Sequence, residues 1–411
     1  MKIEIKPVKF GDCSIIRGNS NILLIDCGSD NADNGLSSQE FAYSKIESLI
    51  KSDEITHILI SHFHKDHFNG LLQIPDEYRV QRTFLPYSII NKKVIYTDGL
   101  MRLIAIAPPR SWGFQLSKRI IKLFKKLDKI SERPEFLKKG DYISFENIKI
   151  RVLWPEITDT AMFSYNDLPV KIAYDTAKSG YYVSYIQNDN NMQFDSFSNI
   201  EGYLNNEFDE IVGQDSPELR GAMSHFGESF NEYLQILHDN VEAPFESVNE
   251  AYTSLLYQHD LFFSSLGQHP ERLNRVKQFA CQQYNSLVTS MNAISLVCDC
   301  DEKFLFLGDA PKSVVEYLQN NSLFNARYKF VKIQHHGTES HYTRKKPNGE
   351  YSLISNGGYS NRKVYVKYQN SKHILCTNAH NHPDSFCQYY IDKKECSPNC
   401  DKVDTGHVIH L

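Results

Sequence analysis

One short run of the chain brings together residue types that bind metal ions. Residues 62–67 read His-Phe-His-Lys-Asp-His, so three imidazoles and one carboxylate fall within six positions. Crowding these groups is costly unless a cation organises them, and imidazole with carboxylate oxygen is a donor set for zinc, iron or manganese. A histidine-rich surface loop is the alternative. The run directly follows the apolar stretch Ile58–Ile60, which favours a metal cluster at the end of a buried strand.

The spacing within this run predicts two metal sites. A loop at the end of a strand can direct alternate side chains into one cleft, so His62 and His64 are expected to bind one metal, and Asp66 and His67 a second. Asp66 is also a candidate catalytic residue, because a carboxylate at the metal can orient the attacking water. The residues leading to Gly70 predict a loop that enters a helix.

Three other apolar runs end in a carboxylate or an imidazole. They read Leu23-Leu24-Ile25-Asp26-Cys27-Gly28, Phe304-Leu305-Phe306-Leu307-Gly308-Asp309-Ala310 and Lys332-Ile333-Gln334-His335-His336-Gly337. Together with the histidine run, this order of motifs resembles the metallo-β-lactamase superfamily. Within it, the chain is most similar to the soluble hydrolase domain of competence-type DNA-uptake channel proteins and their free-standing relatives. The resemblance covers about residues 1–155 and 292–375.

The resemblance implies a fold and a division of the chain. The fold is the α+β, four-layer αββα metallo-β-lactamase fold, with its first half in residues 1–155 and its second half in 292–375. Residues 156–291 are polar, show helical periodicity in several segments and carry no metal motif, which predicts a largely helical insertion. Residues 376–411 form a Cys/His-rich C-terminal tail.

The resemblance also implies roles for residues outside the histidine run. Asp309 should bridge two metals, and His336, which stands directly before a glycine, should complete the second site. His335 then becomes a catalytic group that faces the substrate or supports a ligand. Asp26 is expected to accept an N–H from a metal-bound imidazole, although an Asp shortly before Gly28 is also typical of a turn.

One ligand of the family pattern is missing. The superfamily usually supplies a third histidine to the first metal, and no obvious match precedes the late strands. Asn292 is the expected counterpart, and its amide oxygen is a weaker zinc ligand than imidazole, so the first metal is expected to bind loosely. The histidines of the insertion are another source of a ligand, although each is more typical of a surface or packing residue; they are His225, His238, His259 and His269.

The tail suggests a separate, structural zinc site. Its four cysteines are Cys376, Cys387, Cys396 and Cys400. Four thiolates suit a closed tetrahedral zinc site. Only Cys396 and Cys400 approach the spacing of a zinc knuckle, so ordinary reduced thiols are the alternative.

Local patterns predict the elements that position these residues. Residues 37–51 predict a helix with a serine cap at 37 or 38 and Glu40 in its first turn, and residues 117–127 predict a basic amphipathic helix. A hairpin is expected to turn at Glu146-Asn147. Strands are expected at Ile3–Val8, Ser14–Arg17, Asn21–Asp26, Ile55–Ile60, Thr83–Pro86, Ala293–Cys298, Phe304–Leu307, Tyr328–Gln334 and Tyr351–Ser355.

Composition limits the location and the partners of the protein. The 411 residues are 41% hydrophobic and 23% charged, which argues against a wholly disordered or fibrous chain. The net charge of −5 leaves nucleic-acid contact to basic patches at 118–129 and 344–346, for which a solvated helix face and a loop are the alternatives. The N-terminus reads as a strand and no apolar run is long enough to span a membrane, so a cytoplasmic protein with reduced cysteines is expected.

The expected function is that of a metal-dependent hydrolase. The resemblance implies one or two zinc ions, or manganese, that activate a hydroxide. The expected substrate is a phosphodiester in a nucleic acid or a nucleotide, which would make the protein a nuclease or phosphodiesterase. Two alternatives stay open: a hydrolase of a small ester, lactone or phosphoester, and a metal-binding module that contacts a protein partner through residues 156–291. No membrane partner is expected.

Overall fold

The computed structural model divides the chain into two compact units. The described residues are 1–33, 35–86, 108–109, 111–156, 160–165, 168–175, 180–185, 216–239, 245–325, 327–344, 347–356, 364–365, 367–368, 372–377, 400–402 and 406–411. The first unit contains Met1–Ser88, Lys122–Lys171 and Ser290–Leu411, and the second contains Ile89–Ile121 and Ile172–Thr289. The histidine run and the late motifs all belong to the first unit.

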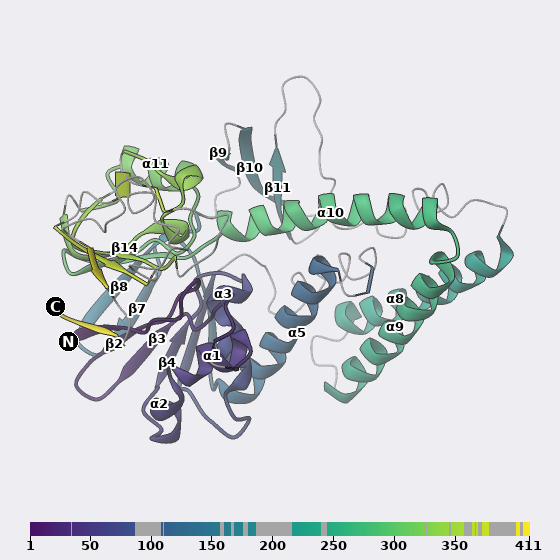
Figure 1. Ribbon diagram of the computed structural model, residues 1–411, viewed down its shortest axis with the longest axis horizontal. Helices are drawn as coiled ribbons and strands as arrows, with labels where there is room; N and C mark the ends of the chain where they lie inside the picture. Colours follow the sequence, from purple (N-terminus) through teal and green to yellow (C-terminus); the bar gives the residue numbers. More distant parts are fainter. Residues whose placement is uncertain are drawn as a thin grey trace. The chain divides into compact units, whose positions relative to one another are not determined.

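A seven-stranded sheet carries the N-terminal motifs. Its order is β18 (His407–His410), β1 (Lys2–Ile5), β2 (Ser14–Arg17), β3 (Ile22–Ile25), β4 (His57–Leu59), β5 (Arg82–Pro86) and β6 (Pro134–Leu137). Strands β1 to β3 pair antiparallel, whereas β3 to β6 pair parallel. Because β18 pairs with β1, the N-terminal and C-terminal strands lie side by side (Figure 1).

An eight-stranded sheet carries the late motifs. Its order is β17 (Cys400–Lys402), β16 (His373–Cys376), β15 (Asn348–Ile354), β14 (Arg327–Lys332), β13 (Phe304–Phe306), β12 (Val297–Cys300), β8 (Ile148–Trp154) and β7 (Tyr142–Phe145). Strands β13 to β17 pair parallel, and β7 and β8 form the predicted hairpin. The strand predicted at 293–298 begins only at Val297, because the preceding residues finish helix α10 (Pro270–Ala293).

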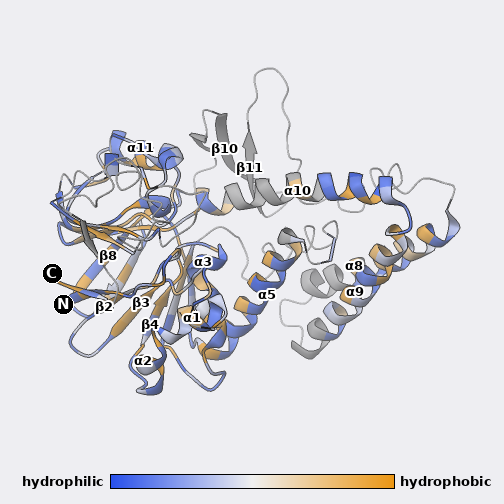
Figure 2. Ribbon diagram, in the orientation of Figure 1, coloured by the Kyte–Doolittle hydropathy of each residue, from blue (hydrophilic) through white to orange (hydrophobic). Residues whose placement is uncertain are grey.

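The two sheets face each other across one apolar core. Leu23 and Ile25 of β3 belong to the same buried cluster as Phe304 and Phe306 of β13. Leu24, whose side chain points to the other face of β3, is also fully buried, so this strand is covered on both faces. Apolar residues accordingly run along β3 and β4 in Figure 2. The core therefore fixes both sheets beneath the loops at their edges.

Helices cover the outer faces of the two sheets. Helices α1 (Ser38–Ser44) and α2 (Glu47–Lys51) lie beside β3 and β4, and α11 (Lys312–Asn320) follows β13 (Figure 1). The helix predicted over residues 37–51 is divided into α1 and α2 at Lys45-Ile46. Ser37, one of its two predicted caps, forms a capping box in which the Ser37 hydroxyl accepts from the Glu40 N–H and the Glu40 carboxylate accepts from the Ser37 N–H. The mixed α+β architecture, with two facing sheets and outer helices, is that of the metallo-β-lactamase fold, as predicted.

The second unit is built mainly from long helices. They are α8 (Pro217–Asp239), α9 (Phe245–Leu266) and most of α10. Phe226 of α8 stacks on Phe262 of α9 with ring centroids 5.6 Å apart.

A separate three-stranded sheet contains β9 (Thr160–Tyr165), β10 (Leu168–Asp175) and β11 (Gly180–Tyr185), which the sequence analysis did not predict. Within the described part of the chain, no helix combines the length and the apolar character needed to cross a membrane.

Candidate metal centre

The predicted site residues meet where parallel strands of the two sheets end. Strand β3 is followed by Asp26, and β4 by residues 62–67. In the other sheet, β13 is followed by Asp309 and β14 by residues 335–336. Carboxyl ends of parallel strands share one edge of a sheet. The two edges adjoin, since His67 Nε2 lies 3.4 Å from Asp309 Oδ1.

Two groups of described side chains have ligand atoms close enough to share a metal ion. The first is His62, His64 and Asp309, and the second is Asp12, His67, Asp309 and His336; within each group the ligand atoms lie within 4.8 Å of one another. Asp66 Oδ2 lies 3.0 Å from His336 Nε2 and 3.9 Å from His67 Nε2, which adds this carboxylate to the second group. The six ligands predicted from the sequence therefore meet in one cluster.

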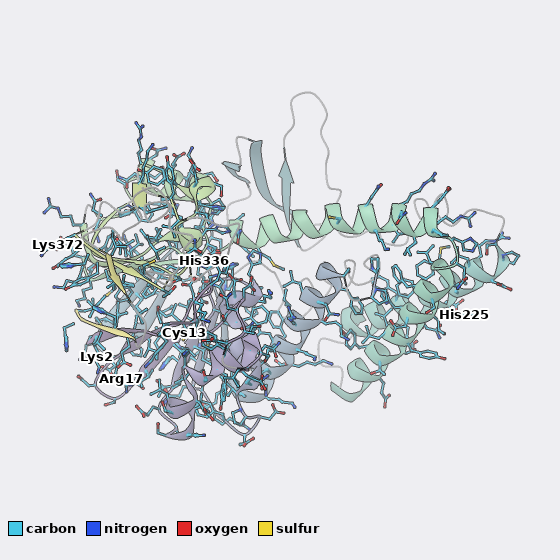
Figure 3. All side chains as sticks on the ribbon, viewed as in Figure 1. Lys2, Cys13, Arg17, His225, His336 and Lys372 are labelled. Atoms are coloured by element: carbon cyan, nitrogen blue, oxygen red, sulfur yellow. The ribbon has the colours of Figure 1, made fainter. Side chains whose placement is uncertain are left out.

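Hydrogen bonds fix which nitrogen of two buried imidazoles faces Asp309. His336 Nδ1 lies 3.1 Å from the Ser355 carbonyl, which can only accept, so Nδ1 carries the proton. His67 Nδ1 lies 2.9 Å from Asp26 Oδ2 and donates to it for the same reason. The Nε2 lone pairs are left on the other side, each 3.4 Å from an Asp309 oxygen. Figure 3 labels His336 among the side chains that pack in the first unit.

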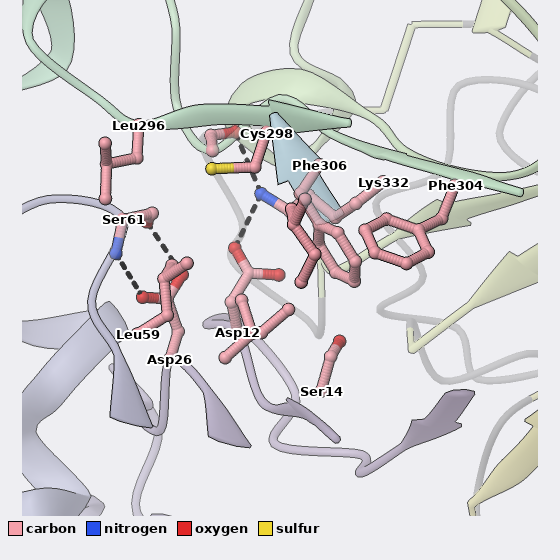
Figure 4. A pocket seen from close by; sticks show the side chains of 13 residues that line it. Asp12, Ser14, Asp26, Leu59, Ser61, Leu296, Cys298, Phe304, Phe306 and Lys332 are labelled. Atoms are coloured by element: carbon pink, nitrogen blue, oxygen red, sulfur yellow. Dashed lines mark hydrogen bonds and ion pairs between the residues drawn. The ribbon is translucent and has the colours of Figure 1, made fainter. Parts of the chain in front are cut away.

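Ser61 orders the first group in the same way. Its N–H and its hydroxyl each donate to an Asp26 oxygen at 2.7 Å (Figure 4). Because the hydroxyl proton is thus used, Ser61 Oγ accepts from His62 Nδ1 at 3.2 Å. His62 Nε2 then faces Asp309 Oδ2 at 3.8 Å. The sequence analysis missed this serine, although its place between the buried strand and the first histidine was a usable signal.

The unpartnered Nε2 atoms of the buried histidines fit a divalent cation. The Nε2 atoms of His62, His67 and His336 are buried, and none has a partner at hydrogen-bond geometry in the part of the chain that the structure describes. A buried lone pair without a partner costs free energy. Three such nitrogens that converge with carboxylates make a ligand set for zinc or a similar metal.

Nearby charges perturb the protonation of the same rings. Burial lowers the pKa of His336, but Asp309 and Asp66 outweigh burial and raise this pKa to about 9. Burial also opposes the protonation of His67, yet its carboxylate neighbours, Asp309 foremost, raise its pKa well above the usual value. The pKa of His62 falls well below its usual value, because burial and two adjacent imidazoles disfavour its charge. A metal cation bound at Nε2 in place of these protons would offset the negative charge of the same carboxylates.

Three residues at the strand ends that carry the cluster have a left-handed backbone conformation. Asp26, His335 and His336 have left-handed φ angles of 54°, 43° and 55°. Such conformations cost non-glycine residues about 1–3 kcal/mol and occur preferentially at functional sites. Gly28 shows how tightly the ligand loop is seated, because a Cβ there would lie 2.4 Å from the carbonyl carbon of Asp66.

A buried ion pair behind the cluster was missed by the sequence analysis. Asp12 Oδ2 lies 2.7 Å from Lys332 Nζ, and both side chains line a cavity of about 10 Å³ between the sheets, which has room for about one water (Figure 4). Asp12 Oδ2 also lies 3.5 Å from His67 Nδ1 and 3.9 Å from His336 Nδ1. It therefore supports these two rings on the side opposite their Nε2 atoms. The usable signal was a lysine inside an otherwise apolar strand.

His335 lies on the partly exposed side of the cluster. Its side chain is 13% exposed, and its Nε2 lies 3.9 Å from Asp309 Oδ2. The Thr338 hydroxyl donates to the His335 carbonyl, so its oxygen accepts from His335 Nδ1 at 2.9 Å. The ring stacks on His341 with centroids 3.7 Å apart. The Nε2 lone pair of a neutral His335 is therefore directed toward the cluster.

Asn292 lies in a segment that touches the cluster. Its side chain is buried, and its Oδ1 has no hydrogen-bond partner in the described part of the chain. Three residues on, the Ser295 hydroxyl accepts from the Asp309 N–H at 3.3 Å. Its predicted role beside the first metal stays a prediction. Of the insertion histidines, the described His225, His259 and His269 belong to neither ligand group, and the side chain of His238 lies outside the described residues.

The four tail cysteines are only partly described. Cys376 is buried in β16, and Cys400 begins β17, where its backbone is in register with Ile374. Cys387 and Cys396 lie outside the described residues, as does the side chain of Cys400. The predicted tail zinc site therefore stays a prediction.

Part of the predicted basic helix is neutralised. This helix is α5 (Trp112–Ile130), and both Lys126 and Lys129 form ion pairs with Asp76. Lys118 lies over the Phe114 ring, 5.3 Å from its centroid. In the second predicted patch Arg344 is exposed, and residues 345–346 lie outside the described part. These lysines are therefore less available to phosphates than the sequence pattern suggests.

The side chains that could hold a metal ion lie partly in a segment that resembles a known family. Residues 7–82 match the family model of the Metallo-beta-lactamase superfamily. One similar solved structure is MEM-A1, a subclass B3 metallo-β-lactamase from a soil metagenome library, at 10% identity and a TM-score of 0.24, with 65% of this chain and 94% of that chain covered. Another is the Rm3 metallo-β-lactamase, at 14% identity and a TM-score of 0.21, with coverage of 61% and 88%. No curated protein sequence matches the chain.

The family match covers the part of the chain that holds most of the ligands. Residues 7–82 include Asp12, Asp26 and the whole histidine run. The likeness to the metallo-β-lactamase superfamily therefore rests on residues 7–82. The structural likenesses are too low in TM-score to add to it. The closer relationship to competence-type DNA-uptake proteins stays a prediction.

Proposed function

We propose that this protein is a two-metal hydrolase, loaded with zinc or manganese, that cleaves phosphodiesters. The observation that carries the proposal is the convergence of three buried Nε2 lone pairs on the Asp309 carboxylate. A divalent cation satisfies the lone pairs and the carboxylate together. The family match supports a hydrolase. The choice of substrate rests on the charge of the cluster.

The buried charges fit one or two divalent cations. Four carboxylates are buried at the cluster, those of Asp12, Asp26, Asp66 and Asp309, together with one lysine, Lys332. With neutral imidazoles, three negative charges are uncompensated, and a single divalent cation leaves one of them. Two divalent cations leave one positive charge instead. A buried site with one excess positive charge favours an anionic group at its opening.

The chain itself supplies orientation and proton transfer. When bound, a divalent cation lowers the pKa of a coordinated water and polarises a substrate oxygen. Asp66 is held by its main chain, since its carbonyl accepts from the Asp12 N–H at 3.0 Å, and its carboxylate is placed to orient the attacking water. His335 Nε2, on the partly exposed side, is placed to exchange a proton with the leaving oxygen.

Two features support a phosphodiester over an uncharged ester. Before the coordinated water loses its proton, the excess positive charge of a two-cation site attracts an anion, whereas it offers little to a neutral ester. The partly exposed residues beside the ligands include Lys65 and His335, whose nitrogens suit phosphate oxygens. Lys65 is also held by Asp30 at 2.8 Å, which fixes its position. The exposed Arg344 supports a nucleic acid as the source of the phosphodiester.

Hydrolysis assays with matched substrates test this proposal. Protein stripped of metal and reloaded with zinc or manganese should cleave bis-p-nitrophenyl phosphate faster than p-nitrophenyl acetate or a simple lactone. The His64→Ala variant should lose this activity, while the exposed His225→Ala variant on α8 should keep it. Faster turnover of the acetate or the lactone would contradict a phosphodiester substrate. Single-stranded and double-stranded DNA in the same assay separate a nuclease from an enzyme for small phosphodiesters.

A further inference from the structure

Lys332 is a buried cation that contacts carboxylates from both sheets at the candidate metal centre. It ends β14, and its side chain is 3% exposed. Nζ lies 2.7 Å from Asp12 Oδ2 and donates to the Gly308 carbonyl at 3.0 Å. The same nitrogen lies 3.4 Å from Asp309 Oδ1. Burial of a lysine costs free energy unless carboxylates and carbonyls surround it. Lys332 has such partners, so its charge is part of the structure of this site.

We propose that Lys332 is a positioning residue of the metal centre, which holds Asp309 Oδ1 and leaves Oδ2 as the oxygen shared by the two ligand groups. The inference deepens the proposed two-metal function and rests on it. A carboxylate can bridge two cations through both oxygens or through one. An oxygen already held by an ammonium group is less available to a second cation, because the two positive charges repel.

The surroundings of the two Asp309 oxygens support this division. Oδ2 lies 3.8 Å from His62 Nε2 of the first group and 3.4 Å from His336 Nε2 of the second. Oδ1 lies 3.4 Å from His67 Nε2, which belongs to the second group, and 3.4 Å from Lys332 Nζ. Only Oδ2 is within 4 Å of ring nitrogens from both groups among the described residues.

The ion pair also connects ligand segments that come from different sheets. Asp12 precedes β2 in the first sheet, and its N–H donates to the carbonyl of Asp66 at 3.0 Å. Lys332 belongs to the second sheet and contacts Asp309 directly. The contact between Asp12 and Lys332 therefore links the backbone of a first-sheet ligand to the side chain of a second-sheet ligand. Through this link, Lys332 can set the spacing of the two metal positions.

A variant that removes both charges tests the proposal without stranding one of them in the core. The double variant Asp12→Asn with Lys332→Met removes one negative and one positive charge together, so the net buried charge does not change and the fold should survive. Lys329→Met is the matched control, because Lys329 lies on the same strand, 42% exposed, and pairs with Glu350 at 3.3 Å. Circular dichroism checks the fold, and the single variant Asp12→Asn, which retains the lysine, provides a second readout.

Electron paramagnetic resonance of manganese-loaded protein measures the metal pair without any assay of activity. Wild type and Lys329→Met should give the exchange-coupled signal of two manganese ions about 3.5–4 Å apart. The double variant should lose most of that signal while it still binds manganese, and Asp12→Asn should retain an intermediate fraction. An unchanged coupled signal in the double variant overturns the role of Lys332 and leaves the proposed function standing. Should the double variant not fold, an unchanged signal in the single variant Lys332→Gln overturns it instead. A wild-type protein that binds no metal overturns both.

Discussion

The two sheets of the first unit contribute to the metal cluster in different ways. The first sheet supplies four ligands from one run, residues 62–67, on a loop that leads into the short helix α3 (Lys65–Phe68). The second sheet supplies Asp309 and His336 from two strand ends, where the parallel register aligns Phe306 with Lys332. A contiguous run can be recognised in sequence. Ligands on neighbouring strands come together only through the register of the sheet.

The same difference predicts how much metal is lost when a ligand from either sheet is removed. A ligand from the run, such as His64, belongs to one group, whereas Asp309 belongs to both. Loss of a first-sheet ligand should therefore weaken one metal position. Loss of Asp309 should weaken both.

The largest effect is expected for Asp309→Ala. This variant should lose both metals, and turnover should fall at least about a thousandfold, because metal polarisation of the substrate contributes several kcal/mol. His64→Ala should instead retain about one metal per chain. Elemental analysis of both variants measures the difference, with Asp260→Ala, exposed on α9, as the control. Full occupancy of both positions in Asp309→Ala would show that this carboxylate does not bridge.

A smaller loss is expected for Asp26→Asn. Asp26 belongs to neither ligand group among the described residues but accepts from His67 Nδ1 and from Ser61, so the substitution should disturb the orientation of two rings of the first sheet. Removing such a partner typically weakens metal affinity or activity about 10–100-fold. Competition with a chelator measures the affinity. An affinity equal to that of the wild type would mean that Asp26 serves only the turn.

The protonation of His336 predicts a pH dependence of the metal-free protein. Its pKa in the folded state is raised to about 9, above the unfolded value near 6.5. The stabilisation from its protonated form is therefore complete below pH 6.5 and is lost as pH rises through about 9. Urea unfolding at pH 6.5 and 9 should show this loss without metal and little of it with metal bound. A metal-free protein that is equally stable at both pH values would contradict the charge arrangement.

The smallest effect is expected away from the cluster, at the cap of α1. Ser37→Ala removes a side-chain acceptor from the capping box and should lower the free energy of unfolding by about 1 kcal/mol. Metal content should not change, because Ser37 is exposed and contacts no ligand group among the described residues. Urea unfolding together with elemental analysis measures both quantities. A loss of metal in this variant would mean that α1 supports the cluster more directly than its contacts indicate.

Sequence patterns were sufficient for the elements whose signal is local. The capping box at Ser37 and the hairpin at Glu146 follow from a few adjacent residues and occur as predicted. The start of β12 was placed too early, because the end of α10 has the same apolar character as the strand that follows. The strands β9 to β11 were not predicted, because residues 156–291 were interpreted as a whole from their polar composition and helical segments, although these three short stretches are rich in apolar and aromatic residues.

The partners of the ligands were harder to predict than the ligands themselves. Asp12 and Lys332 lie 320 positions apart in the sequence, and each alone resembles an ordinary turn residue or strand residue. Their 2.7 Å contact forms only because the two sheets pack face to face, and no local sequence pattern predicts that packing. Ser61 similarly gains its role only because Asp26, on the adjacent strand end, accepts a hydrogen bond from its hydroxyl.

Counting metal in the purified protein tests the two-metal centre most directly. After reconstitution with zinc or manganese and removal of loosely bound ions, the wild type should carry two equivalents at the cluster, plus one zinc if the tail cysteines bind it. The variant Cys396→Ser with Cys400→Ser separates that contribution, because it alters only the tail. A stoichiometry of two in this variant agrees with the shared Asp309 and the converging imidazoles. Absence of bound metal before and after reconstitution would contradict the proposed centre.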